Sequence, residues 1–272
     1  MVDVPRMSVL RWAGSKRCAS DDLERVFREY PIETFWEPFG GSLSATMVAL
    51  RVGAKRIVVS DVNASLVNFY EQLRDRPEEL IECLGNIHDD FYENRSLYNA
   101  ESDALTKAAL FYYLNGTCFN GLFRENKRGE YNVPWGKRKF SFDPEELRTF
   151  SRMLRSIELN AMGYDRFFDR FLSFMGPGDL LYADPPYYAT FSNYDKETFS
   201  KEDHERLKAR CDAARTRGVR IVASNSDEPF VRDLWSPEYV IRDFKNVRLF
   251  NPNGKDRGTR SREILVTSNN ES

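Results

Sequence analysis

A nine-residue stretch, Leu180-Leu181-Tyr182-Ala183-Asp184-Pro185-Pro186-Tyr187-Tyr188, most constrains the fold of this chain. It begins as a short apolar run with the character of a buried strand. It stops at two prolines, which have no N–H for a sheet ladder. A carboxylate, Asp184, therefore stands where a buried strand ends. In open α/β sheets, ligands bind beyond the carboxyl ends of the strands, so the stretch predicts such a sheet with Asp184 at its ligand site.

The residues at the end of this strand suit an amino-bearing heterocycle. Asp184 and the carbonyl of Pro185 can both accept hydrogen bonds from one –NH2 group. Two residues further on, Tyr187 offers a flat face to a planar ring. The alternative is an ordinary strand followed by an Asp-Pro turn, which is the commoner use of these residue types. The remaining motifs of the chain favour the ligand site.

A glycine turn and a second acid point to a nucleoside ligand. The stretch Phe35–Ser42 is a strand that breaks into Gly40-Gly41, and an apolar-rich helix follows from Ser44 to about Val52. Glycines at such a junction let a ligand approach the backbone and the helix N-terminus closely. A further buried strand then ends in Asp61, about 20 residues on, where nucleoside-binding folds place an acid against ribose hydroxyls. The alternative is an ordinary βαβ unit with an exposed Asp61.

The N-terminal motif Arg11-Trp12-Ala13-Gly14-Ser15-Lys16 places a tight turn between an aromatic and a basic residue, ahead of a helix expected over 21–30. Its tryptophan can stack on a ring and its lysine can pair with a carboxylate. Taken alone, the motif is a weak signal.

Between about Ala64 and Ser156 the alternation of strands and helices lapses. Apolar spacing predicts helices over 66–74, 77–87 and 104–115, followed by short alternating runs punctuated by glycine between 116 and 136. We expect a hairpin or loop there that presents Asn120, Arg124 and Lys139. Aromatic, basic and amide side chains in one loop suit contact with DNA bases. Residues 64–156 are therefore expected to form an inserted, mainly helical domain between two parts of a sheet domain, 1–63 and 157–272.

The second part of the sheet domain has its own regular pattern. We expect strands over 155–159 and 220–224, helices over 164–175 and 199–216, and a final antiparallel pair over 239–247 and 263–268. Ser200, followed by Asp203, predicts the start of the second of these helices.

Composition limits the class of protein. The 272 residues include 41% hydrophobic and 30% charged residues, without an apolar run long enough for a membrane span or a secretion signal at the start, so a cytoplasmic protein is expected. Four scattered cysteines and two histidines argue against a metal site or a disulfide framework.

The net charge of −2 argues against a generic nucleic-acid binder. However, basic residues concentrate over 124–139 and 242–262, and local basic stripes can follow phosphates. The alternative is that each of these basic stretches is an ordinary solvated surface.

Together these motifs resemble the Dam-type family of DNA adenine-N6 methyltransferases, also called the D12 or α class. The matching blocks, in order along nearly the whole chain, are Arg11–Lys16, Glu37–Ser42, Ser60–Asn63, Phe119–Arg124, Tyr131–Gly136 and Asp184–Tyr187. The block Asp-Pro-Pro-Tyr is shared with cytosine-N4 and RNA methyltransferases, whereas the blocks between 119 and 136 are more specific. The resemblance implies a Rossmann-like methyltransferase sheet carrying an inserted target-recognition domain.

The resemblance also implies S-adenosylmethionine as cofactor and double-stranded DNA as partner, with an enzyme that works as a monomer. The cofactor-binding residues it implies are Trp12, Lys16, Glu37, Phe39, Gly41, Asp61 and Asp184. Asp184, Pro185 and Tyr187 would hold a flipped adenine and carry the catalysis. The DNA-recognition residues it implies are Arg11, Phe119, Asn120, Leu122, Arg124, Pro134, Arg138 and Lys139.

Several of these positions match those that read bases in relatives methylating GATC, so GATC or a related short site is expected. Three positions depart from the pattern. Leu43 stands where many relatives have glycine or another small residue, Arg138 replaces an aromatic residue, and Phe119 often appears as tyrosine.

Two alternatives stay open: methylation of another amino base, such as cytosine N4 or an RNA base, and a catalytically silent DNA-binding protein. Whether the enzyme acts alone or in restriction-modification is also open.

Overall fold

A computed structural model of the chain describes residues 4–188 except 6, 13, 17 and 18, together with residues 199–247 and 260–268. Its centre is a sheet in which the described strands follow the order β3-β2-β1-β4-β5-β7-β6. These strands are β1 (Thr34–Glu37), β2 (Arg56–Asp61), β3 (Ile157–Ala161), β4 (Leu180–Ala183), β5 (Arg220–Ser226), β6 (Tyr239–Val247) and β7 (Arg260–Ser268). The first five run parallel, and β7 is antiparallel to both of its neighbours. The expected α/β fold is therefore confirmed.

Helices cover both faces of this sheet. In the order of the chain, the helices are α1 (Ser20–Phe27), α2 (Ser44–Arg51), α3 (Ala64–Asp75), α4 (Pro77–Gly85), α5 (Phe91–Ala100), α6 (Ala104–Thr117), α7 (Pro144–Leu154), α8 (Tyr164–Phe171), α9 (Lys201–Arg215) and α10 (Pro229–Trp235). Short 3-10 turns add η2 (Phe119–Gly121) and η3 (Leu172–Phe174).

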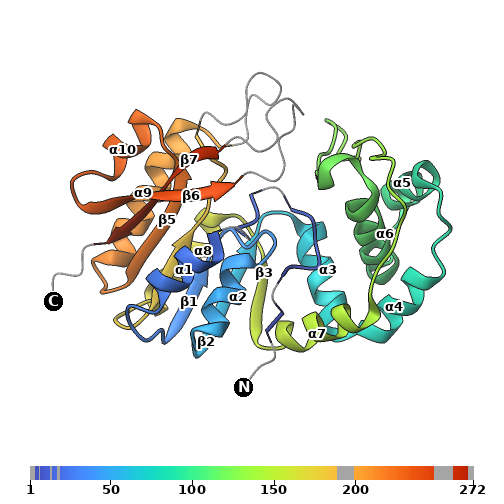
Figure 1. The fold of residues 1–272 in the computed structure, drawn as a ribbon, viewed down its shortest axis with the longest axis horizontal. Coiled ribbons are helices and arrows are strands. Elements are labelled where there is room, and N and C mark those ends of the chain that lie inside the picture. Colours follow the sequence, from blue (N-terminus) through green and yellow to red (C-terminus); the bar gives the residue numbers. More distant parts are fainter. Residues whose placement is uncertain are drawn as a thin grey trace.

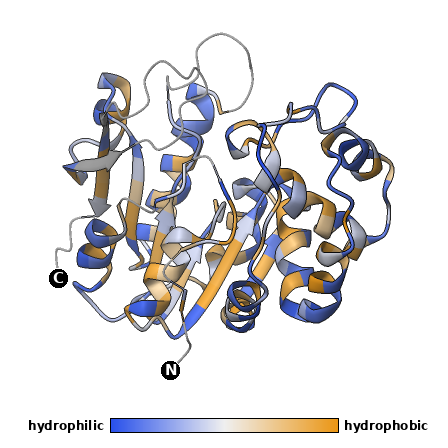
Figure 2. Ribbon diagram, turned by 45° about the vertical axis from the view of Figure 1, so that its right-hand side comes forward, coloured by the Kyte–Doolittle hydropathy of each residue, from blue (hydrophilic) through white to orange (hydrophobic). Residues whose placement is uncertain are grey.

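Strand periodicity explains why two cores form. Successive side chains of a strand point to opposite faces of the sheet. Accordingly Phe35 packs with α1, α2 and α3 on one face, whereas Trp36, the next residue of β1, packs with α8, α9 and α10 on the other. The strands are hydrophobic on both faces, as expected for a parallel sheet between helix layers, and Figure 2 shows this hydrophobic interior running along the strands.

The order in which the chain connects the strands makes the carboxyl ends of β1 and β4 a distinct place in the sheet. From β1 the chain moves outward to β2 and β3, then returns to the other side of β1 to form β4 and β5 (Figure 1). The direction of winding therefore reverses between β1 and β4. The carboxyl ends of two such strands diverge there and leave a crevice in which α/β proteins bind ligands.

The segment between β2 and β3 forms a helical region beside the sheet (Figure 1). Helix α3 contacts β2 and β3 on one side and α6 and α7 on the other. Ten of the 14 residues of α6 are buried, which makes it the central helix of this region. After α6, isolated antiparallel bridges join Cys118 to Trp135 and Glu125 to Tyr131. The expected hairpin-like loop is thus present.

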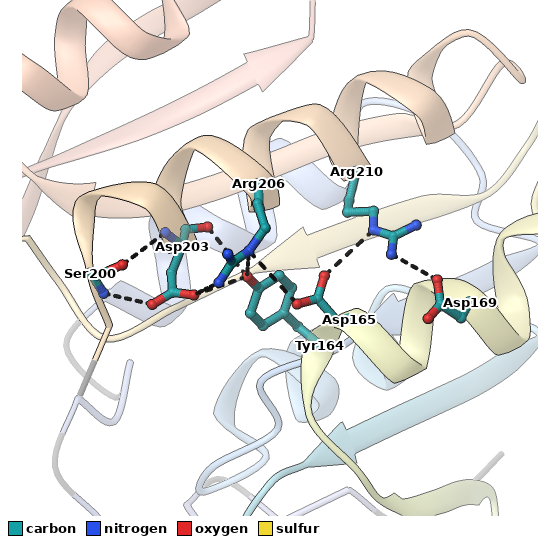
Figure 3. Close-up of polar contacts among 7 residues, drawn as sticks. All are labelled: Tyr164, Asp165, Asp169, Ser200, Asp203, Arg206 and Arg210. Atoms are coloured by element: carbon teal, nitrogen blue, oxygen red, sulfur yellow. Dashed lines mark hydrogen bonds and ion pairs between the residues drawn. The ribbon is translucent and has the colours of Figure 1, made fainter. Parts of the chain in front are cut away.

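A polar network fastens α8 to the start of α9 (Figure 3). The Ser200 hydroxyl accepts a hydrogen bond from the backbone N–H of Asp203, and the Asp203 carboxylate accepts one from the N–H of Ser200, so the predicted capping signal is confirmed. Arg206 pairs with Asp203, and Arg210 pairs with Asp169 at 2.7 Å. The first of these pairs lies within α9 and the second joins α9 to α8, as does the Tyr164 hydroxyl, which donates to the Asp203 carbonyl at 3.4 Å.

Two features are absent from the described residues. In this part of the chain, no helix combines the length and apolar character needed to cross a membrane. Over the same residues, no three His, Cys, Asp or Glu side chains gather as a metal ion would require.

Candidate active site

Asp184 lies where the sequence predicts it, at the carboxyl end of β4. All four residues of β4 are buried, and the parallel ladder pairs Leu180 and Leu181 with β1. Because Pro185 and Pro186 lack an N–H, the strand ends here and Asp184 emerges beside the point where the sheet reverses its winding. Its side chain is partly exposed, at 17%.

Two buried donors orient the Asp184 carboxylate. Lys16 Nζ donates to Oδ2 at 2.6 Å, and the Ser224 hydroxyl donates to Oδ1 at 2.6 Å. The Lys16 side chain is only 3% exposed, so this ion pair is shielded from solvent. The Tyr182 hydroxyl lies 2.9 Å from Ser224 and extends the network into the core. The expectation that Lys16 pairs with a carboxylate is confirmed.

The end of β5 supplies residues that the sequence reasoning missed. Asn225 Oδ1 accepts a hydrogen bond from the Tyr188 N–H at 3.1 Å, and the Ser226 hydroxyl donates to the Tyr188 carbonyl at 2.7 Å. The expected strand stops at Ser224, whereas β5 continues to Ser226 with every residue from 221 onward buried. A run of three small polar residues at the end of an apolar strand is the signal that could have found them.

The ring of Tyr187 lies beside the same carboxylate. Its hydroxyl donates to Glu263 Oε2 at 3.0 Å, and the ammonium of Lys16 lies 5.0 Å from the ring centroid. Burial raises the pKa of the Tyr187 hydroxyl well above its ordinary value, and the nearby carboxylates of Asp184 and Glu263 raise it further. The phenol is therefore neutral and acts as a hydrogen-bond donor.

The glycine turn packs tightly between β1 and α2. A Cβ on Gly40 would lie 2.4 Å from Val59 Cγ1, and Gly41 has a φ of +46° with Trp12 only 3.1 Å from the position of its missing Cβ. Asp61 binds this turn, because its Oδ2 accepts the Gly41 N–H at 2.9 Å. The turn, the tryptophan and the acid that the sequence assigned to one ligand are thus in contact.

Leu43 occupies an unusual conformation at the start of α2. Its φ of 60° and ψ of 22° are left-handed, a region that favours glycine. Its side chain is 1% exposed and packs in the core beside the turn. Glycine at this position would relieve backbone strain, and the leucine offsets that strain with buried apolar surface.

Glu37 ends β1 and is 2% exposed. The Thr46 hydroxyl donates to its carboxylate. Burial raises the pKa of Glu37 well above its ordinary value of 4.5. The Thr46 hydrogen bond opposes that rise, whereas the negative charges of Asp184 and Asp61 add to it. Glu37 is therefore a buried acid that resists ionisation, close to the partly buried ion pair of Asp184.

This raised pKa predicts a specific pH dependence of stability. Above about pH 4.5 the unfolded chain releases the Glu37 proton while the native protein retains it, so the free energy of unfolding falls as pH rises toward the native pKa. Glu37→Gln removes this loss, because the amide is neutral at every pH. We therefore expect Glu37→Gln to raise the free energy of unfolding at neutral pH relative to the unaltered protein.

The measurement is the melting temperature of both proteins between pH 4.5 and 8, in which the advantage of Glu37→Gln grows with pH. The exposed Glu205 supplies the control, since Glu205→Gln removes a surface charge without changing a buried acid. A difference that stays constant with pH would contradict the assignment.

The cofactor candidates do not all face one space. Lys16, Glu37, Asp61 and the Gly41 turn surround the carboxyl ends of β1, β2 and β4. The Phe39 ring instead stacks on Tyr164 at 5.6 Å and meets the core on the side of α8 and α9. Phe39 thus supports the turn from the opposite face of the sheet.

The DNA-recognition candidates gather around the η2 turn. The backbone of Arg11 exchanges two hydrogen bonds with the side chain of Asn115, and its Cβ lies 2.7 Å from the position of the missing Cβ of Gly121. The N-terminal motif and the loop after α6 are therefore in contact. Phe119 is 38% exposed, and Asn120 has a left-handed φ of 56°.

The rest of this loop is largely exposed. Arg124 Nε donates to Asn132 Oδ1 at 2.8 Å, and the N–H of Asn132 donates to the Arg124 carbonyl, so the two residues hold each other across the hairpin. Leu122 packs against the core. Pro134 and Lys139 are exposed, and the carbonyl of the half-buried Arg138 accepts a hydrogen bond from Trp135.

Comparison with known proteins gives one consistent family. A sequence profile described as "D12 class N6 adenine-specific DNA methyltransferase" matches residues 12–248. "Type II methyltransferase M1.LlaDCHI" of Lactococcus lactis subsp. cremoris is 30% identical over 95% of this chain and 94% of its own length. "DNA adenine methylase" of Escherichia coli K12 is 30% identical over 94% of this chain and 93% of its own.

A relative from Escherichia phage P1, "DNA N-6-adenine-methyltransferase", is 33% identical over 84% of this chain, which spans only 31% of that longer protein. Among solved structures, a SAM-dependent methyltransferase from Agrobacterium tumefaciens aligns over 93% of this chain and 61% of its own. Its TM-score is 0.44 and its identity 12%, a likeness too distant to add to the family match.

Proposed function

This chain belongs to the D12 class of N6 adenine-specific DNA methyltransferases, and we propose that it methylates an adenine flipped out of the duplex within GATC or a related short site. It is an enzyme that uses S-adenosylmethionine. The observation that carries the proposal is the cluster of Lys16, Asp184 and Tyr187 at the point where the sheet reverses its winding.

The residues around the glycine turn fit the cofactor. Each oxygen of Asp61 accepts one backbone N–H, from Gly41 and from Asn63, and each retains a lone pair for a ribose hydroxyl. The carboxylate of Asp184 suits the cationic part of the molecule, and the neutral acid of Glu37 can exchange a hydrogen bond with it. We propose that Trp12, Lys16, Glu37, Gly41, Asp61 and Asp184 contact the cofactor, with Phe39 beneath the turn.

Catalysis is proposed to rest on Asp184 and the Pro185 carbonyl. The bound cofactor supplies a methyl group on a sulfonium, which is a strong electrophile. The lone pair of adenine N6 is delocalised into the ring and is a weak nucleophile. Hydrogen bonds from the amine to Asp184 and to the Pro185 carbonyl favour the pyramidal nitrogen of the transition state, so they stabilise it more than the ground state.

The target base has to leave the duplex to reach this edge of the sheet. Flipping costs about a few kcal/mol, and stacking on an aromatic ring recovers part of that cost. Tyr187 is the proposed stacking partner, because its ring lies beside Asp184 and is held by its hydroxyl.

Residues 64–156 are proposed to be the target-recognition domain. The loop after α6 presents Arg124, Asn120 and Phe119 on one side of the helical region. Because Asn132 occupies Nε of Arg124, the two terminal nitrogens of the guanidinium point away from that contact and suit a bidentate hydrogen bond to guanine.

Arg124→Ala is expected to relax specificity at one base pair of the site. The loss of a bidentate contact removes about 1–3 kcal/mol of discrimination, which is roughly 5- to 150-fold in relative rate. The measurement compares methylation rates for the preferred duplex and its single-base variants. Arg128→Ala, an exposed basic residue in the same hairpin, is the matched control and should weaken all duplexes equally. An unchanged preference in Arg124→Ala would refute its reading role.

The first test of the function is incubation of the protein with labelled S-adenosylmethionine and duplexes containing GATC, its single-base variants or no related site. Label on adenine only in GATC supports both the reaction and the site. Label on adenine at another site supports the reaction and directs attention to Arg138 and Phe119 as altered readers. Label on cytosine or RNA, or none on any substrate, would favour the alternatives left open by the sequence.

A further inference from the structure

Glu263 is an acid in an unfavourable place. It belongs to β7, where every side chain from 263 to 268 is buried, and it is the one charged residue in that run. Its exposure is 4%. A carboxylate removed from water costs several kcal/mol unless hydrogen bonds or an opposite charge compensate it. The contacts of the Glu263 carboxylate therefore indicate which group it serves to position.

One of these contacts is the Tyr187 hydroxyl, which donates to Glu263 Oε2 at 3.0 Å. Strand register brings this about, because β7 pairs with β5 so that Glu263 lies opposite Ser226. Ser226 and its neighbour Asn225 hold the backbone of Tyr188. Two strands therefore support the Asp-Pro-Pro-Tyr motif: β5 holds the main chain of Tyr188, the residue directly after it, and β7 holds the far end of the Tyr187 ring.

Two different contacts restrict the direction of the Tyr187 ring and its rotation about χ2. A tyrosine hydroxyl lies on the χ2 rotation axis, so a hydrogen bond to it fixes the direction in which the ring projects and leaves rotation about that axis free. The Lys16 ammonium, 5.0 Å from the ring centroid, lies over one face and limits the rotation. Glu263 and Lys16 together define both the place and the plane of the ring.

We infer that Glu263 is a positioning residue for methyl transfer: it holds the Tyr187 ring where the target base stacks. The inference rests on the proposed stacking role of Tyr187 and goes beyond it, because it assigns a function to a residue of the last strand. Displacement of a positioning group by about 1 Å can lower a rate by about 10²-fold. We therefore expect a loss of about 10- to 100-fold when the acceptor is removed.

The experiment is a double-mutant cycle on the single-turnover rate of methyl transfer, measured on a duplex that the unaltered protein methylates. Glu263→Leu removes the acceptor and should give the loss stated above, whereas Glu263→Gln keeps an oxygen in place and should stay within about threefold. Tyr187→Phe keeps the ring and removes its hydroxyl. In that background Glu263→Leu should cause no further loss, because the contact is already gone.

The other outcomes distinguish failure of the positioning role of Glu263 from failure of the proposed function. If Glu263→Leu lowers the rate equally in both backgrounds, or not at all, the positioning role is wrong while the proposed function stands. If Glu263→Leu does not fold, Glu263→Asp serves instead, since it keeps the charge and withdraws the acceptor by one methylene. It should lower the rate only when the Tyr187 hydroxyl is present. If the unaltered protein forms no N6-methyladenine, the proposed function fails and the inference falls with it.

Discussion

Asp184→Ala is expected to lower the rate of methyl transfer by about 10²- to 10⁴-fold, the range that removal of a positioned catalytic group produces. The carboxylate is held between Lys16 and Ser224 at 2.6 Å from each, so its orientation does not depend on the substrate. No neighbouring side chain at the end of β4 can replace it, because the next two residues are prolines. The measurement is the single-turnover rate at saturating cofactor and DNA.

The same substitution is expected to lower stability. Lys16 is 3% exposed, and loss of its partner leaves a buried ammonium uncompensated, which costs about 3–5 kcal/mol. Thermal unfolding has to accompany the rate measurement for that reason. Asp184→Asn is the sharper variant, since its amide oxygen can still accept from Lys16 and preserves more of the fold. Turnover near that of the unaltered protein in Asp184→Ala would exclude Asp184 from the reaction, whereas in Asp184→Asn it would show that a neutral acceptor is sufficient.

Gly136→Ala is expected to disrupt the proposed recognition loop, which follows α6, while leaving the sheet intact. A Cβ at this position would lie 2.4 Å from the carbonyl oxygen of Cys118 and 3.0 Å from the N–H nitrogen of Phe119. Backbone atoms cannot move aside as a flexible side chain can, so the η2 turn has to shift. Overpacking of this kind costs about 1–3 kcal/mol. Through displacement of Phe119 and Asn120, we expect specific DNA affinity to fall roughly 10- to 100-fold, as a cost of that size implies.

Gly116→Ala provides the matched control in the same region. Its Cβ would lie 3.8 Å from the ring of Phe140, which is ordinary contact, and its position within α6 favours alanine over glycine by about 1 kcal/mol. Its DNA affinity should be unchanged and its melting temperature equal or higher. Cofactor affinity should be the same in both variants. A Gly136→Ala protein that binds DNA normally would show that the loop tolerates the shift.

Local patterns in the sequence were sufficient for most of the sheet. The prolines after Ala183 end β4, the spacing between the glycine turn and Asp61 fits β2, and the predicted bounds of β6 agree with the structure at both ends. These features could be predicted because each depends only on residues that are neighbours in the sequence. They are a missing N–H, a buried run and a capping side chain.

Three helices, α5, α7 and α10, were missed, the first two for different reasons. Helix α5 has the sequence Phe-Tyr-Glu-Asn-Arg-Ser-Leu-Tyr-Asn-Ala, with few strong helix formers, and its packing against α6 stabilises it. Helix α7 had a usable signal in Asp143-Pro144-Glu145-Glu146, which places an N-cap, a first-turn proline and acids in order.

Contacts between distant residues lay beyond sequence reasoning about this chain alone. Lys16 and Asp184 are 168 positions apart, and Glu263 follows Tyr187 by 76. Such pairs depend on the order of strands in the sheet, which local propensity does not determine. The family resemblance named Lys16 because it belongs to a motif, whereas Ser224, Asn225 and Glu263 belong to none of the motifs that were recognised.

Strand β7 sets the order in which the active site can be completed during synthesis. It follows all other described strands in the chain, yet it lies between β5 and β6 and pairs with both. Ribosomes add roughly 5–20 residues per second, so the nascent protein holds Asp184 and Tyr187 for several seconds before Glu263 exists. During that time β5 and β6 cannot adopt their final spacing. The emerging enzyme therefore gains the Glu263 contact to Tyr187 only after the loop that follows α6 and the Gly40-Gly41 turn have been made.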